Sequence, residues 1–80
     1  MKIEYTKHAK EKLDDRKIPK SIVESILKKP DKTIETKFGR KIAQKAIDDK
    51  LLRIVYEEQK GIYIIITVYY TRPERYGDKT

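Results

Sequence analysis

His8 is the residue of this sequence best suited to proton transfer. It is the only histidine in the chain, and histidine has an unperturbed pKa near neutral pH. A first-turn helix residue that is partly stacked on a neighbour fits the same position, and spacing alone favours that structural role. A metal site is not expected, because the sequence has no second histidine, no cysteine and no tight carboxylate cluster to accompany His8.

Three basic residues stand where a charge needs a partner. Arg53 interrupts the apolar run from Leu51 to Tyr56, and a buried guanidinium is costly unless it is paired. Its partner is either an internal carboxylate or the phosphate of a ligand. Lys45 raises the same question less sharply, because its long stem can carry the ammonium group to water. Arg16 is expected at the border of the core, where pairing with a carboxylate or capping of carbonyl groups is favoured over phosphate binding.

Tyrosine and arginine gather towards the C-terminal end of the sequence. Such a mixture suits stacking on single-stranded bases, although tyrosine is also an ordinary strand residue. The residues concerned are Tyr63, Tyr69, Tyr70, Arg72, Arg75 and Tyr76. The chain has no glycine-rich phosphate loop, no Ser-His-Asp order and no paired-carboxylate motif, so hydrolases and kinases of those kinds have no support.

The first part of the chain is expected to hold two short helices. A short alternating strand at 3–5 leads to Thr6, whose hydroxyl can cap a helix that begins at Lys7. Pro19 suits the first turn of a second helix, which Pro30 ends. The apolar arc of this second helix consists of Ile22, Val23, Ile26 and Leu27.

The rest of the chain has an extended periodicity. Short turns separate segments that predict an antiparallel meander, and these segments span 33–37, 40–47, 51–58 and 62–71. The last segment is apolar on both faces, as expected for a strand with a neighbour on each side, and the N-terminal strand is a candidate partner. We therefore expect one α+β domain over 1–71, with a short N-terminal strand, about four antiparallel strands and the helices on one face. The remaining residues, 72–80, are expected to form a flexible tail.

The two faces of this sheet differ in composition if both tight turns close with two residues. The plainer aliphatic face is expected to lie under the helices and carries Ile42, Gln44, Ala46, Leu51, Arg53, Val55, Ile64, Ile66 and Val68. The face expected to be partly open, and suited to stacked bases, carries Ala43, Lys45, Ile47, Leu52, Ile54, Tyr56, Tyr63, Ile65, Thr67 and Tyr69. A one-residue bulge would reverse part of this assignment.

Composition favours a polyanionic partner. The 80 residues include 20 lysines and arginines against 13 acidic residues, for a net charge of +7, and such a field attracts nucleic acid. Abundant Lys, Glu and Ile without any Cys would equally suit a thermophile. The N-terminus lacks a secretion signal and the longest apolar run, 62–70, is too short to span a bilayer, so a cytoplasmic location without membrane contact is expected. A chain of this size holds one thin core and can be a monomer or a homodimer.

A pattern of modest motifs resembles the domain of unknown function 4258 family over roughly residues 3 to 71. The motifs are Tyr5-Thr6-Lys7-His8-Ala9, Leu13, Arg16, Ile18 to Val23, Lys29-Pro30-Asp31, Gly39-Arg40, Lys45, Leu52-Arg53-Ile54-Val55 and Ile66-Thr67-Val68-Tyr69. That family is thought to share the fold of RelE and ParE toxins. RelE-type toxins cut messenger RNA on the ribosome, whereas ParE-type toxins attack gyrase with the same scaffold, so the likeness informs the fold more than the activity.

The resemblance implies a metal-independent endoribonuclease without a cofactor, paired with an antitoxin protein. In that scheme His8 or Tyr69 shuttles protons while Lys45 and Arg53 hold the scissile phosphate. The expected register places Lys45 and Arg53 on opposite faces of the sheet, so they act together only if a bulge intervenes. Further contacts to nucleic acid are expected from Lys12, Arg16, Arg40, Lys41, Tyr63 and Arg72.

Two other function classes stay open. The same basic and aromatic surface could bind RNA or DNA without cleaving it, which would give binding with a steep salt dependence. Alternatively, the apolar last strand and an edge strand could pair with another protein chain, which would give a complex insensitive to salt.

Overall fold

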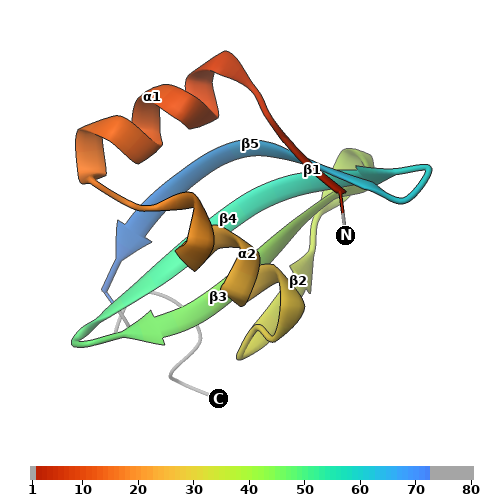
Figure 1. The fold of residues 1–80 in the computed structure, drawn as a ribbon. Helices are drawn as coiled ribbons and strands as arrows, with labels where there is room; N and C mark the ends of the chain where they lie inside the picture. Colours follow the sequence, from red (N-terminus) through yellow and green to blue (C-terminus); the bar gives the residue numbers. More distant parts are fainter. Residues whose placement is uncertain (1, 73–80) are drawn as a thin grey trace.

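The computed structural model describes residues 2–72 as a sheet with two helices (Figure 1). The elements follow in the order β1 (Lys2–Tyr5), α1 (Lys7–Arg16), α2 (Lys20–Lys28), β2 (Lys32–Glu35), the 3-10 turn η1 (Lys37–Gly39), β3 (Arg40–Ile47), β4 (Lys50–Gln59) and β5 (Ile62–Thr71). The predicted order of a strand, two helices and a meander is confirmed. The tail expected at 72–80 lies outside the described residues except for Arg72.

The sheet has five strands in the order β1-β5-β4-β3-β2. The meander from β2 to β5 is antiparallel, whereas β1 pairs with β5 in parallel, so the sheet is mixed and has one strand more than the antiparallel four that the sequence predicts. The predicted partnership between the last strand and the N-terminal strand is confirmed. β5 lies between β1 and β4, and its apolar residues on the helix side pack under α1.

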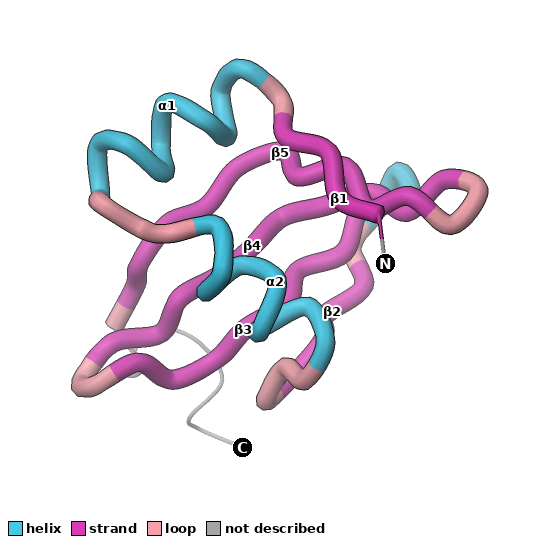
Figure 2. Tube along the Cα trace, viewed as in Figure 1, coloured by secondary structure: helices cyan, strands magenta, loops and turns pink. Residues whose placement is uncertain are grey.

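Both helices lie on one side of the sheet, with α1 along β5 and α2 over β3 (Figures 1 and 2). Each helix turns an apolar stripe towards the sheet, formed by Ala9 and Leu13 in α1 and by Val23, Ile26 and Leu27 in α2. These side chains form one core with the sheet residues Ala43, Leu52, Ile54, Tyr56, Ile65 and Val68. The domain therefore has two layers, and the opposite face of the sheet has no helix over it among the described residues.

The predicted assignment of the two sheet faces is wrong for β3, for β4 and for the first half of β5, where Tyr63 and Ile65 face the core. The helices cover the face of Ala43, Leu52 and Ile54, and the face of Gln44 and Arg53 points away from them. The covered face has no permanent charge at its centre, whereas the alternative would place the Arg53 guanidinium between the sheet and both helices. On β4, the covered face includes Tyr56, which packs into the core through its ring.

A bulge in β5 explains why the last strand departs from simple alternation. Val55 pairs with Thr67 but Tyr56 pairs with Ile65, so Ile66 is an extra residue in β5. Ile65 and Val68 consequently both face the core, and Thr67 and Tyr69 turn to the uncovered face.

Within residues 2–72, neither helix has the length and apolar character that crossing a membrane requires.

Candidate nucleic-acid interface

Thr6 fixes the position of α1 on the sheet. Its Oγ1 accepts a hydrogen bond from the Ala9 amide at 3.1 Å, which caps the helix as predicted. The same hydroxyl lies 3.0 Å from the Ile65 carbonyl oxygen and 3.1 Å from that of Ile66, and the Thr6 amide also donates to Ile65. The N-terminus of α1 is thus held at the bulge of β5.

A tight connection sets α2 against the end of α1. Lys17 adopts the left-handed conformation, and its amide donates to the Asp14 carbonyl at 3.2 Å. The next amide, of Ile18, donates to the Leu13 carbonyl at 2.9 Å, a pairing that commonly ends helices. Pro19 then stands directly before α2, so the two helices are joined by three residues and cannot move far apart.

An open cleft of about 380 Å³ lies between the two helices. Leu13 and Ile18 form its apolar floor, and Lys10, Asp14 and Lys20 stand around it. The Lys20 ammonium lies 5.0 Å from the centre of the Tyr5 ring, which is a cation–π contact. Burial, followed by the charge of Glu24, raises the pKa of Tyr5.

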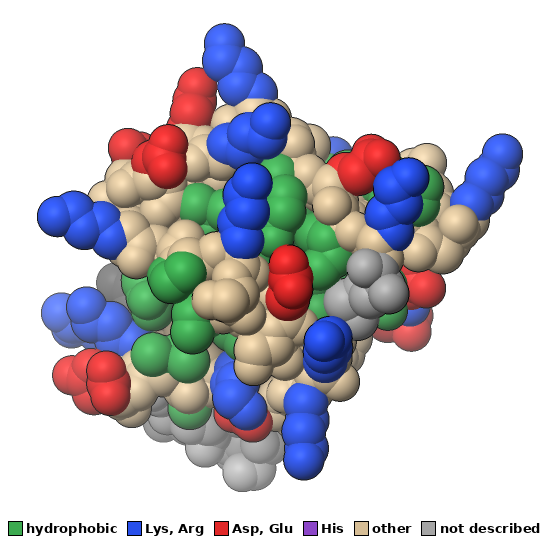
Figure 3. Space-filling view, viewed as in Figure 1, with side chains coloured by type: hydrophobic (Ala, Val, Ile, Leu, Met, Phe, Trp, Pro, Cys, Tyr) green, Lys and Arg blue, Asp and Glu red, His purple; other side chains and the backbone are tan. Residues whose placement is uncertain are grey.

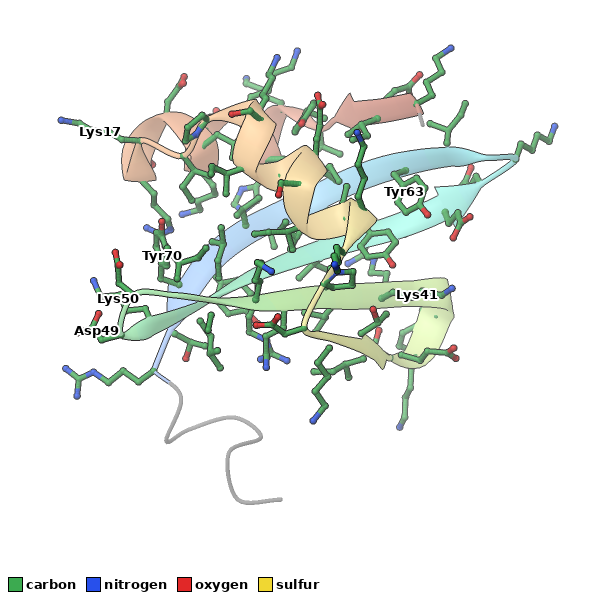
Figure 4. The ribbon with its side chains drawn as sticks, turned by 60° about the horizontal axis from the view of Figure 1, so that its bottom comes forward. Lys17, Lys41, Asp49, Lys50, Tyr63 and Tyr70 are labelled. Carbon is green, nitrogen blue, oxygen red and sulfur yellow. The ribbon has the colours of Figure 1, made fainter. Side chains whose placement is uncertain are left out.

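The helical segment carries more than half of the net positive charge of the chain. Residues 7–29 contain eight lysines and arginines and four acidic residues, a net charge of +4 out of +7. Figure 3 views this side of the molecule and shows Lys and Arg side chains around an apolar strip. Lys17 extends away from the sheet at the end of α1 (Figure 4). We call this surface, formed by α1, α2 and their connection, the helical layer.

The cations of the sheet, in contrast, are partly neutralised. The ion pairs among the described residues join Arg40 to Glu57 at 3.0 Å, Lys41 to Glu58 at 3.9 Å and Lys45 to Asp31 at 3.6 Å. Asp31 also accepts the Ala46 amide at 2.9 Å, and this hydrogen bond, aided by Lys45, lowers the pKa of its carboxyl. None of these ion pairs involves the helical layer, so the free positive charge is concentrated there.

The four residues predicted for catalysis do not share one site. Arg53 and Tyr69 are cross-strand neighbours on the uncovered face, with the guanidinium carbon 5.8 Å from the ring centre. Arg53 is only 5% exposed. Lys45 lies on the helix side of β3 and pairs with Asp31, and His8 is exposed on α1. The structure therefore brings Arg53 and Tyr69 together and separates both from Lys45 and His8. The opposite faces of Lys45 and Arg53 agree with the predicted register.

The residues predicted to contact nucleic acid are spread over the molecule. Lys12 is half-buried on α1, and Arg16 is exposed in its last turn, which corrects its expected place at the border of the core. Arg16 lies beyond the buried stripe of α1, because that stripe ends at Leu13. Tyr63 packs on the core, and its ring centre lies 5.3 Å from that of Tyr56. Arg40 and Lys41 form the ion pairs described above, and Arg72 is exposed directly after β5.

Two features of the surface were not anticipated from the sequence. Lys10 and Lys20 lie on different helices, and their meeting at one cleft depends on the left-handed turn at Lys17. Phe38 is 91% exposed, although the sequence indicated only a turn there. Within residues 2–72, no three His, Asp or Glu side chains lie close enough together to hold a metal ion.

A comparison with protein families gives one result. The family model described as a domain of unknown function, DUF4258, matches residues 5–70. No curated protein and no solved structure matches the chain. The matched region extends from the end of β1 almost to the end of β5, so it includes both helices and nearly the whole sheet. The chain therefore belongs to the DUF4258 family.

Proposed function

We propose that this chain binds single-stranded RNA through its helical layer. The observation that carries the proposal is the concentration of unpaired positive charge there, beside a cleft with an apolar floor. Phosphate contacts supply most of the affinity of nucleic-acid-binding proteins, and cations already paired with carboxylates contribute little to it. Within the described residues, the helical layer combines many cations with the absence of ion pairs to them.

The cleft offers separate contacts for the phosphates and the ribose of a nucleotide. Lys10 and Lys20 bind backbone phosphates, because both residues line the cleft, one from each helix. Leu13 and Ile18, each only 5% exposed, leave a small apolar area at the bottom of the cleft that a ribose can contact. The Asp14 carboxylate accepts a hydrogen bond from a ribose 2′-hydroxyl and repels a phosphate placed too close to it. This last contact favours RNA over DNA, since only RNA has that hydroxyl.

Ribonuclease activity stays a prediction beside this proposal. It depends on the likeness to RelE and ParE toxins, which also implies an antitoxin partner and contact with the ribosome. Proton transfer needs groups within hydrogen-bond reach of the reacting atoms, and His8 and Lys45 lie away from the Arg53–Tyr69 pair. Binding is therefore the part of the predicted function that the surface supports best, and cleavage can be measured on the same samples.

The proposal is tested by the affinity for a labelled single-stranded RNA at one low salt concentration. The variant Lys10→Glu/Lys20→Glu should bind much more weakly than the wild type, whereas Lys2→Glu/Lys60→Glu should lose much less. Both variants carry the same net charge, and all four lysines are exposed, so position is what differs between them. Equal losses in the two variants would refute a site on the helical layer.

Asp14→Asn tests the choice of RNA over DNA. An amide cannot repel phosphate, so this variant should bind single-stranded DNA more tightly while its RNA affinity changes less. Incubation with and without EDTA, followed by electrophoresis of the RNA, reports cleavage in the same experiment. EDTA-resistant cleavage that disappears in His8→Ala would support the ribonuclease prediction, and intact RNA would leave binding alone.

A further inference from the structure

The most exposed apolar side chain of the described residues lies far from the helical cleft. The large hydrophobic residues exposed in residues 2–72 are Phe38, at 91%, and Tyr70, at 37%. At 91% exposure, both faces of the Phe38 ring are open to solvent. Tyr70 differs, because the Lys50 ammonium lies 5.7 Å from its ring centre and its cross-strand neighbour Leu52 is fully buried. Of these two exposed rings in residues 2–72, Phe38 is the one with no contact to a neighbouring cation.

The backbone holds Phe38 in an unusual conformation. Its φ and ψ angles are 65° and 30°, in the left-handed region, and Gly39 follows at a φ of 73°. A bulky side chain at positive φ is strained, and strain of this kind is common at functional sites. The position would suit glycine or asparagine better, so the ring is kept there at a cost to stability.

Thr36 keeps this turn closed. Both its amide and its hydroxyl donate to the Arg40 carbonyl, at 2.9 and 2.8 Å, so the ends of η1 are held together. The backbone of the loop that carries the ring is consequently closed by two hydrogen bonds. A loop backbone that is already closed loses less conformational entropy when it meets a partner.

Lys37 is the cation next to the ring that can bind an anion, because the strand neighbours Glu35, Glu57 and Glu58 balance much of the other positive charge. The segment 37–41 contains three basic residues and no acidic one. Arg40 and Lys41 are held by Glu57 and Glu58, which leaves Lys37 as the cation of this segment without an ion pair among the described residues. An aromatic ring with a free lysine beside it can stack on a base and bind the adjacent phosphate.

We infer that Phe38 stacks on an unpaired base of the bound RNA, with Lys37 on a neighbouring phosphate. The inference depends on the proposed RNA binding and adds a second contact to it. Lys41, which follows η1 closely in the chain, and Tyr70 lie at opposite ends of the sheet (Figure 4). The longest dimension of the domain is 34 Å, so a strand of about ten nucleotides, within the usual size of single-strand sites, can contact both the helical layer and η1.

The experiment measures the affinity of Phe38 variants for single-stranded and double-stranded RNA of about ten nucleotides or base pairs. Loss of one base–aromatic stack is worth about 1 to 3 kcal/mol, so Phe38→Ala should weaken single-strand binding roughly 5- to 150-fold. Duplex binding should change little, because its bases are already stacked. Phe38→Trp keeps an aromatic ring and should bind as tightly as the wild type. Tyr70→Ala removes an aromatic ring from the other end of the sheet and should also leave the affinity near the wild-type value.

Phe38→Asn separates this role from folding. Asparagine tolerates the left-handed conformation better than phenylalanine, so this variant should melt at a higher temperature than the wild type and yet bind single-stranded RNA as weakly as Phe38→Ala. Wild-type affinity in Phe38→Ala, or an equal loss in Tyr70→Ala, would overturn the inference. If Phe38→Ala instead loses binding to vesicles of anionic lipid and keeps its RNA affinity, the ring has a membrane partner and the inference is also wrong.

The failure of this inference and that of the proposed function give different results. If the helical layer binds RNA but Phe38 does not, Lys10→Glu/Lys20→Glu loses affinity and Phe38→Ala keeps it. If the wild type has no affinity for RNA, the proposed function fails first. A cross-link between Phe38 and one photoreactive base of the RNA would give direct support, and cross-linking only to α1 and α2 would refute the contact.

Discussion

Removal of the Thr6 hydroxyl should lower the free energy of unfolding, because this group holds the N-terminus of α1 to the sheet. In Thr6→Ala, the Ala9 amide loses its cap at 3.1 Å, and the carbonyl oxygens of Ile65 and Ile66 lose a donor at 3.0 and 3.1 Å. The Ile65 carbonyl keeps the Thr6 amide, so loss of the helix cap is the larger effect. A lost N-cap costs about 0.5 to 2 kcal/mol, and the additional loss at β5 moves the expected cost to about 1 to 2 kcal/mol.

This cost is large for so small a domain. A chain of this length is expected to have a free energy of unfolding of about 4 to 12 kcal/mol, and each kcal/mol corresponds to about 4 to 8 °C in Tm. Thr6→Ala should therefore lower Tm by roughly 4 to 16 °C. Urea denaturation followed by circular dichroism gives the free energy directly, and the slope of the transition should not change, because the folded structure stays the same.

Thr6→Ser is the matched control, because serine keeps the hydroxyl and lacks only the methyl group. It should lie within about 0.5 kcal/mol of the wild type. The reasoning is refuted if Thr6→Ala unfolds at the wild-type urea concentration. It is equally refuted if Thr6→Ser loses as much as Thr6→Ala, since the methyl group and not the hydrogen bonds would then be responsible.

Two further predictions concern the core and the pH dependence of stability. Ile54 is fully buried at the centre of the sheet, so Ile54→Ala should lower the free energy of unfolding by about 2 to 5 kcal/mol, whereas Ile34→Ala on the edge strand, where the side chain is only half-buried, should cost less. Urea denaturation measures both, and equal losses would contradict the assigned core. The Ala46 amide, with Lys45, lowers the pKa of Asp31, so the stability that Asp31 contributes is present above its unfolded pKa and is lost as pH falls through its lower folded pKa. Asp31→Asn should reduce this acid-dependent loss in the thermal melting curves, and an unchanged pH profile would contradict the assigned role.

The order of the elements was readable from the sequence because local signals define it. Thr6 caps α1 as expected, and Pro19 and Pro30 bracket α2 closely. The β strands follow from runs of apolar and branched residues between short turns. The partnership of β1 with β5 was indicated by the apolar character of β5, but its parallel direction was not.

The faces of the sheet could not be read in the same way. The extra residue at Ile66 shifts the alternation of β5, and no turn residue marks it in the sequence. The choice between the two faces of β3 and β4 also depended on how Arg53 is accommodated, and an arginine in an apolar run does not say which side the helices cover. Register and packing decide this together, and both are long-range properties.

The candidate site was accessible only in part for the same reason. The expected excess of basic residues was visible in the composition, but which cations are neutralised depends on pairs such as Arg40 with Glu57, which are 17 positions apart. The cleft between Lys10 and Lys20 depends on the left-handed turn at Lys17. The exposure of Phe38 likewise follows from a backbone conformation that phenylalanine rarely adopts, so propensities could not indicate it.

The most direct test of RNA binding by the helical layer is the salt dependence of the affinity. The logarithm of the association constant for a single-stranded RNA should fall linearly with the logarithm of the salt concentration, with a slope of about 0.7 for each phosphate bound. Lys10→Glu/Lys20→Glu removes two phosphate contacts and should reduce this slope by about 1.4 or more, whereas Lys2→Glu/Lys60→Glu, with the same net charge, should keep nearly the wild-type slope. Equal slopes for the wild type and Lys10→Glu/Lys20→Glu, or no measurable binding at low salt, would contradict the account.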